Sequence, residues 1–287
     1  MADILHISDL HFGPPFLPER AEAVQRLAAE APPDVVVVSG DLTQRARRRQ
    51  FEAAADYLHR FDAPVVVVPG NHDVPLYRVW ERFLSPYAHY RDLISRRLDT
   101  VTRLERMTIV GLNSSRSFTF KNGRLEKEQL EFAAAAFEET PEDHLRVVVT
   151  HHHLAPPPDF SSDRVMPRAK RALEVFRGQG VDLILAGHMH RAYIGDSLDF
   201  FPGEEREEGI VIVQCGTTTS ARGRGRERFK NSLNYIRAAD GRVEITHYLW
   251  RDAEEGFWPH SRHRFGLPPR IWLGKSPMPF YRRMHGT

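Results

Sequence analysis

The chain has 287 residues, of which 41% are hydrophobic and 27% are charged. This balance is typical of a soluble globular protein that buries a sizeable core, and the length suits one large domain or two small ones. The net charge of +2 is too small to indicate nucleic-acid binding, and the single cysteine, Cys215, excludes an internal disulfide bond.

The N-terminal segment, MADILHISDL, lacks the basic start and the long apolar run of a signal peptide. No apolar run approaches the roughly 18 residues that a membrane-spanning helix needs. We therefore expect a cytoplasmic protein without a transmembrane segment.

Short apolar runs rich in β-branched residues alternate with amphipathic stretches along most of the chain. The runs predicted as strands are 3–8, 34–39, 64–69, 107–113, 146–150 and 181–186. The stretches predicted as helices are 19–30, 47–60, 126–139 and 167–178. Runs such as VVVV at 35–38 are apolar at every position, which indicates strands that are covered on both faces. The alternation predicts an α/β fold.

After residue 209 the pattern changes to that of antiparallel strands. GIVIVQC and the two runs on either side of the ADG turn at 239–241 are the candidate strands. We expect mixed sheets packed together, with helices outside, in one domain over residues 1–250. Within it, the basic loop ARGRGRERFK at 221–230 is either a solvated connection, which is the favoured interpretation, or a loop that faces a phosphate.

The last segment, residues 251–287, is rich in Pro, Arg and aromatic residues and shows no clear period. Its aromatic side chains, among them Trp258, Phe265 and Trp272, would be costly to leave exposed. We expect this C-terminal extension to wrap the domain or to contact a partner, and a peripheral membrane contact could form through it. A homo-oligomer is a separate possibility.

Residues of the metal-ligand type follow each of the strongest predicted strands. In chain order they are Asp9 and His11, then Asp41, Asn71 and His72, His151 to His153, and finally His188 and His190. Sites in open α/β sheets form beyond the carboxyl ends of the strands, so these ends can deliver the side chains to one place. Any one of the motifs is common in turns. The whole ordered set predicts a single site.

This ordered set resembles the pattern of the calcineurin-like metallophosphoesterase superfamily, which is D-x-H, GD, GNH[D/E], H and GHxH. The resemblance runs from Ile4 to about Leu249, and the GNHD ending and the HHH run are most similar to class III cyclic nucleotide phosphodiesterases. It implies a four-layer α/β/β/α sandwich of two mixed sheets with helices outside. It also implies a binuclear metal-dependent enzyme that hydrolyses a cyclic nucleotide or another small phosphodiester.

The resemblance assigns each metal ligand. One ion takes Asp9, His11, Asp41 and His190, and the other takes Asp41, Asn71, His151 and His188, so that Asp41 bridges the pair. These nitrogen and oxygen ligands suit Mn, Fe, Zn or Co. A hydroxide that bridges the two ions would attack the phosphorus in line.

His72 is not needed as a ligand, and the resemblance makes it the catalytic imidazole that faces the leaving-group oxygen. It and Asn71 are also expected to contact the substrate. Two interpretations of Asp73 stay open, as a catalytic partner that fixes the tautomer of His72 and as a turn-stabilising carboxylate. His152 is expected to support the ligands or face the substrate, and His153 is expected to be structural.

Other functions of the same fold stay open. A nuclease would use the 221–230 loop to bind a strand, and a pyrophosphatase of nucleotide-sugar lipids would work at a membrane surface through the extension. A scaffold without activity is disfavoured because all seven predicted ligands are present. The aromatic residues Tyr77, Trp80 and Tyr87 either stack on a nucleobase or belong to the core, and the core is the more common outcome.

Overall fold

The computed structural model describes residues 1–118, 122–155, 165–199 and 209–267. Its six α-helices in this described part are α1 (Pro18–Glu30), α2 (Arg48–Leu58), α3 (Val79–Leu84), α4 (Ala88–Leu93), α5 (Lys127–Glu138) and α6 (Ala169–Gly178). None of these helices has the length and apolar character that crossing a membrane requires.

Two six-stranded sheets form the centre of the molecule. The first has the strand order β12-β11-β10-β1-β2-β3 and the second has the order β4-β5-β6-β7-β9-β8. Strands of the first sheet are β1 (Ala2–Ile7), β2 (Val35–Val38), β3 (Val65–Val67), β10 (Ser232–Ala239), β11 (Arg242–Arg251) and β12 (Gly256–Gly266). Strands of the second are β4 (Thr100–Arg103), β5 (Met107–Leu112), β6 (Leu145–Thr150), β7 (Leu183–Ala186), β8 (Tyr193–Asp196) and β9 (Val211–Gln214).

Both sheets are mixed, because each contains parallel and antiparallel strand pairs. Parallel pairs join β1 to β2 and β2 to β3 in the first sheet, and they run through β5, β6, β7 and β9 in the second. Antiparallel pairs add β10, β11 and β12 on one side, and β4 and β8 at the two edges of the second sheet.

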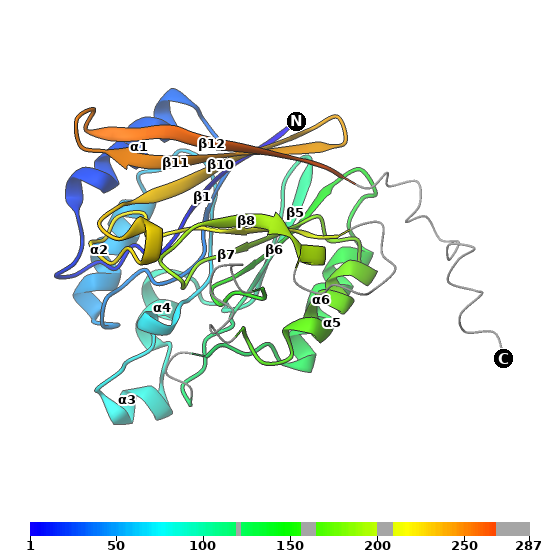
Figure 1. Ribbon diagram of the computed structural model, residues 1–287. Helices are drawn as coiled ribbons and strands as arrows, with labels where there is room; N and C mark the ends of the chain where they lie inside the picture. The colour runs from blue at the N-terminus through cyan, green and yellow to red at the C-terminus, as the bar shows by residue number, and fades with distance from the viewer. Residues whose placement is uncertain (119–121, 156–164, 200–208, 268–287) are drawn as a thin grey trace.

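Three apolar clusters define four layers (Figure 1). The facing sides of the two sheets meet in one cluster, to which Ile4 of β1 and Val147 of β6 belong. The other face of the first sheet packs on α1 and α2, and the other face of the second sheet packs on α5 and α6. The predicted α/β/β/α sandwich is therefore confirmed, and the all-apolar strands are those that are buried on both faces.

The predicted boundary at residue 250 falls inside a β-hairpin. Strand β12 pairs along its length with β11, from Arg251 opposite Gly256 to Arg242 opposite Gly266. The first part of the predicted extension is thus the edge strand of the first sheet. Trp272 and the rest of the extension from residue 268 lie outside the described residues.

Candidate metal centre

The parallel strands deliver their following residues to one edge of the two stacked sheets. Asp9 follows β1, Asp41 follows β2, and the short 3₁₀ turn Asn71–Asp73 follows β3. From the second sheet, His151 comes directly after β6, and His188 comes shortly after β7. The structure therefore brings together the residues of all five strand ends in two adjoining groups.

The first group gathers four donor atoms, namely Asp9 Oδ1, His11 Nε2, Asp41 Oδ2 and His190 Nε2. His11 Nε2 lies 3.2 Å from His190 Nε2 and 3.6 Å from Asp41 Oδ2. Asp9 Oδ1 lies 3.2 Å from His190 Nε2 and 3.7 Å from His11 Nε2. Tetrahedral ligands at about 2.0 Å from an ion are separated by about 3.3 Å, so this spacing fits a metal site.

The second group gathers Asp41 Oδ1, Asn71 Oδ1, His151 Nε2 and His188 Nδ1. Asn71 Oδ1 lies 3.1 Å from His151 Nε2 and 2.9 Å from His188 Nδ1. His151 Nε2 lies 3.3 Å from His188 Nδ1 and 3.4 Å from Asp41 Oδ1. Asp41 thus presents one carboxylate oxygen to each group, which is the arrangement that a bridging ligand requires.

Two buried carboxylate oxygens support the fit of these residues to cations. Among the described residues, Asp9 Oδ1 and Asp41 Oδ2 are buried oxygens without a hydrogen-bond donor. A buried acceptor left in this state costs free energy, and a bound cation would remove the cost. The nitrogen and oxygen donors are those expected for the metals named above.

The imidazoles are held in the form that binds metals. His151 Nδ1 donates to the Ser39 carbonyl at 2.8 Å, and His190 Nδ1 donates to the Arg222 carbonyl at 3.0 Å. A carbonyl oxygen only accepts hydrogen bonds, so both rings carry their proton on Nδ1. Their Nε2 lone pairs therefore point toward the other candidate ligand atoms.

Burial keeps these rings neutral. It lowers the pKa of His190 to about 3, and together with His152 and His151 it lowers the pKa of His188 well below its usual value. Burial alone would raise the pKa of Asp41, but His151 and His72 lower it on balance. Neutral imidazoles around an ionised carboxylate are the ligand states that a metal ion needs.

The backbone is strained where the ligands leave the strands. Asp9, His11, Asp41, His188 and His190 all have positive φ angles, between 51° and 73°. Residues other than glycine rarely adopt this conformation, and such strain gathers at functional sites. The turns that aim these side chains inward are therefore maintained at a cost in stability.

Gly70 sits where no side chain fits. A Cβ atom at this position would overlap the Oδ1 atom and the backbone nitrogen of Asp41. We expect Gly70→Ala to push the Asp41 carboxylate away from the second group and to weaken manganese binding at least tenfold, measured by equilibrium dialysis. Gly178→Ala is the control, because nothing lies within 4 Å of its Cβ position. Equal manganese affinities in the two variants would contradict this expectation.

His72 lies beside the first group and outside both sets of ligands. Its ring meets the ring of His11 edge to face, with 4.8 Å between the centroids, and its backbone N–H donates to Asp41 Oδ1 at 2.8 Å. Its Nδ1 donates to the Gln44 carbonyl at 3.0 Å. The ring is therefore oriented by a backbone carbonyl, and Nε2 is the nitrogen that can exchange a proton with a ligand.

The hydrogen bonds of Asp73 go to the surrounding turns and not to the His72 ring. Its Oδ1 accepts from the N–H and the hydroxyl of Thr43 at 2.8 and 2.9 Å, and its Oδ2 accepts from the N–H groups of Leu42 and Gly70 at 3.1 and 2.9 Å. Burial and the nearby Asp41 raise the pKa of Asp73 to about 7, against the effect of these N–H groups. These contacts favour the turn-stabilising interpretation of Asp73, which stays a prediction.

Asp73→Asn is expected to lower the stability of the fold more than the rate of hydrolysis. The new amide NH₂ would face either two N–H groups or the donors of Thr43, so about two hydrogen bonds are lost. We expect the free energy of unfolding to fall by roughly 3 kcal/mol or more, measured by urea denaturation. The turnover per folded molecule should change less than tenfold. Asp56→Asn, on an exposed position of α2, is the control.

A loss of turnover in Asp73→Asn at unchanged stability would instead return Asp73 to a catalytic role.

His152 lies closer to the second group than the sequence indicated. A ring nitrogen of His152 comes within 4.8 Å of those of His151 and His188, and its Nδ1 is 2.8 Å from the Ser114 hydroxyl. The side chain is buried, as is that of His153, whose ring stacks on His188 at 5.9 Å. His152 therefore supports the ligand shell, and its contact with substrate stays a prediction.

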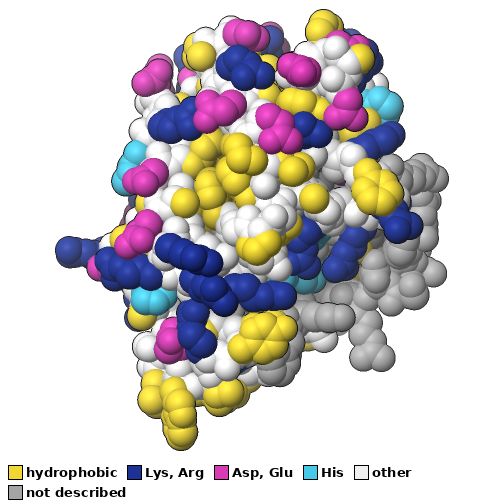
Figure 2. All heavy atoms as spheres, turned by 90° about the vertical axis from the view of Figure 1, so that its left-hand side faces the viewer, with side chains coloured by type: hydrophobic (Ala, Val, Ile, Leu, Met, Phe, Trp, Pro, Cys, Tyr) yellow, Lys and Arg dark blue, Asp and Glu magenta, His cyan; other side chains and the backbone are white. Residues whose placement is uncertain are grey.

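The segment after the Asn71–Asp73 turn exposes two aromatic side chains. Tyr77 and Trp80 are 74% and 80% exposed. At the lower end of the molecule in Figure 2, hydrophobic side chains lie beside Lys and Arg. Arg45 lies over the Tyr77 ring at 5.4 Å. Tyr87 is different, because it packs against the core and donates its hydroxyl to the Ser115 carbonyl at 2.6 Å. Only Tyr87 of the three follows the expectation of a core residue.

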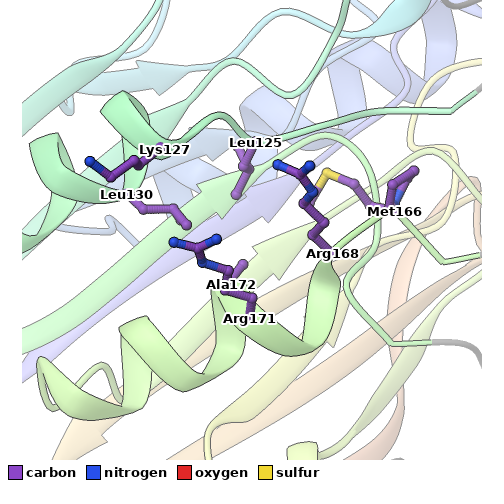
Figure 3. A pocket seen from close by; sticks show the side chains of 8 residues that line it. Leu125, Lys127, Leu130, Met166, Arg168, Arg171 and Ala172 are labelled. Atoms are coloured by element: carbon purple, nitrogen blue, oxygen red, sulfur yellow. The ribbon is translucent and has the colours of Figure 1, made fainter.

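A small cavity between α5 and α6 lies apart from the ligand groups. Leu125, Leu130 and Arg168 are among its lining residues (Figure 3). Its volume of about 20 Å³ holds about one water molecule. It is too small for a substrate.

Comparisons with known proteins agree with this geometry. The family model described as calcineurin-like phosphoesterase matches residues 2–192. A probable cyclic nucleotide phosphodiesterase of Synechococcus is 28% identical over 192 residues, which cover 64% of this chain and 69% of that protein. The 3',5'-cyclic adenosine monophosphate phosphodiesterase CpdA of Escherichia coli K12 is 28% identical over 55% of this chain, and the match spans 54% of that protein.

Solved structures agree on the fold. A purple acid phosphatase from yellow lupin superposes with a TM-score of 0.73 at 12% identity, over 96% of this chain and 55% of that one. A dimetal phosphatase from Danio rerio superposes with a TM-score of 0.65 at 12% identity, over 93% of this chain and 99% of that one. With the family match over more than half of its length, the chain belongs to the calcineurin-like phosphoesterases and is similar within them to the cyclic nucleotide phosphodiesterases.

Proposed function

We propose that the chain is a binuclear metal-dependent phosphodiesterase that hydrolyses a small phosphodiester, with cyclic nucleotides as the favoured class. The observation that carries the proposal is the position of Asp41, whose two carboxylate oxygens each face a separate group of donors. The names of the curated relatives support the substrate class.

Seven residues would hold the ions. Asp9, His11 and His190 would complete one site with Asp41, and Asn71, His151 and His188 would complete the other. When bound, the ions would neutralise the phosphate and supply a water of lowered pKa as the nucleophile. Asn71 is a neutral ligand, so it adds no negative charge that would repel a phosphodiester.

His72 would act on the leaving group. Its Nδ1 proton is donated to the Gln44 carbonyl, so the imidazolium form would give its second proton, on Nε2, to the departing oxygen and become the neutral ring. It would also stabilise the negative charge that develops on the phosphoryl oxygens. The fixed ring needs no reorganisation during the reaction.

A substrate panel tests this function. The manganese-loaded protein should hydrolyse a cyclic nucleotide or an aryl phosphodiester faster than a nucleotide-sugar lipid or single-stranded DNA, and it should hold two manganese ions per chain. Hydrolysis of DNA alone would favour the nuclease alternative. Fewer than one ion per chain together with no hydrolysis of any member would favour a scaffold.

A further inference from the structure

The basic loop at 221–230 places one of its arginines beside the candidate metal centre. The side chain of Arg222 is half-buried, whereas those of Arg224 and Arg228 are exposed. Arg222 Nη1 donates to the side-chain oxygen of Gln44 at 2.8 Å. The loop is therefore not a uniformly solvated connection, which was the favoured interpretation of its sequence.

Gln44 connects this arginine to His72. Its side chain is buried, its amide oxygen accepts from Arg222, and its backbone carbonyl accepts from His72 Nδ1 at 3.0 Å. One residue thus holds both an imidazole and a guanidinium at the same side of the ligand groups.

Backbone contacts fix the base of Arg222. Its carbonyl accepts from His190 Nδ1 at 3.0 Å, and the N–H of Arg224 donates to the His190 carbonyl at 3.0 Å. The preceding residue, Ala221, donates its N–H to the Pro15 carbonyl at 2.8 Å. The loop is bonded to the candidate metal ligand His190 at Arg222 and again at Arg224, so the position of the Arg222 side chain is coupled to that of the metal site.

The charge of Arg222 acts on the acidic ligands. Burial and Asp41 raise the pKa of Asp9, and Arg222 acts in the opposite direction. An arginine has five N–H donors, and its contact with Gln44 uses one of them. The planar fork that remains matches the oxygens of a phosphate.

We propose that Arg222, positioned by Gln44, binds a non-bridging oxygen of the substrate's phosphoryl group. This role rests on the proposed function, and it extends the site to the loop at 221–230, beyond the five strand ends. Arg222 supplies a positive charge from the protein itself next to the predicted metal ions. Its geometry selects a phosphoryl group that keeps at least one free anionic oxygen.

Equilibrium binding of inorganic phosphate to the manganese-loaded protein tests the proposal. Titration calorimetry should show a dissociation constant about 10- to 100-fold weaker for Arg222→Gln, the loss expected for a charged hydrogen bond. Arg222→Lys keeps the charge but loses the fork, so its affinity should fall between those of Arg222→Gln and the unchanged protein. Arg228→Gln, an exposed member of the same loop with the same change in charge, should bind phosphate normally.

Two further measurements separate binding from folding. Manganese content and thermal unfolding of Arg222→Gln should match those of Arg228→Gln. Unchanged phosphate affinity in Arg222→Gln, or a loss of its manganese, would overturn the proposal. The phosphate titration needs no hydrolysis, so it can fail while the substrate panel succeeds, and it can succeed where no tested phosphodiester is hydrolysed.

Discussion

Asp41→Asn is expected to abolish hydrolysis and to weaken metal binding at both groups of ligand atoms. The substitution keeps the size of the side chain, but it replaces a charged oxygen of the bridging carboxylate by an NH₂ group that cannot bind a cation. His11 Nε2 lies 3.6 Å from Asp41 Oδ2, and His151 Nε2 lies 3.4 Å from Asp41 Oδ1. In the variant, one of these two nitrogens would face the new NH₂ group in place of a carboxylate oxygen. The manganese content should fall from two ions per chain to one or fewer.

The effect on rate should be large because the bridging charge serves both ions. A loss of several kcal/mol of transition-state stabilisation corresponds to a fall in kcat/KM on the order of 10³-fold or more. Steady-state hydrolysis of an aryl phosphodiester and metal analysis of the same sample measure the two effects. Asp62→Asn, at an exposed position after α2, controls for the change in charge. Two bound ions with full activity in Asp41→Asn would refute the bridging role.

The sequence indicated the strand ends because local chemistry marks them. A strand that is apolar at every position must be buried on both faces, and a run of Asn, His and Asp after it has no apolar surface to bury. Asp9, Asp41 and His151 each follow such a strand, and the whole ordered set indicated a site where no single motif did. Their meeting point follows from the parallel arrangement, since the carboxyl ends of parallel strands lie on one edge of a sheet.

Contacts between distant parts of the chain could not be predicted in this way. The orientation of His72 depends on the carbonyl of Gln44, 28 residues away. Backbone carbonyls carry no sequence signal, so Asp73, the neighbouring carboxylate, was the only visible candidate. The position of Arg222 could not be predicted for the same reason. Its partners Gln44 and His190 are distant in sequence, and the sequence of its loop is typical of an exposed basic turn.

Strand β12 was missed because it is an edge strand. His260, Arg262 and Arg264 are exposed on it, as is Trp258, and Pro259 stands near a register shift at His247 and Tyr248 of β11. Proline is tolerated at edges and bulges because no ladder hydrogen bond is lost there. The alternation that marks a strand is interrupted by this shift, so the segment reads as an irregular extension. Its pairing partner β11 determines its conformation.

His72→Ala is expected to lower kcat while both ions stay bound. The His72 ring contacts His11 but contributes no atom to either group of donors, so manganese content should be unchanged. A positioned general acid contributes roughly 10²- to 10⁴-fold to a rate. We therefore expect a fall in kcat of that size for a cyclic nucleotide, with a much smaller change in KM. His59→Ala, an exposed histidine at the end of α2, is the matched control.

The leaving group decides which role His72 has. A p-nitrophenolate departs without a proton, whereas the alkoxide of a ribose needs one. If His72 Nε2 protonates the leaving oxygen, His72→Ala should lose far less activity on a p-nitrophenyl phosphodiester than on a cyclic nucleotide. Equal losses on both substrates would mean that His72 stabilises charge on the phosphoryl oxygens instead, because that charge develops with either leaving group. The proton-transfer role predicts unequal losses, since the hydrogen bond to Gln44 leaves Nε2 as the nitrogen that can give up a proton during the reaction.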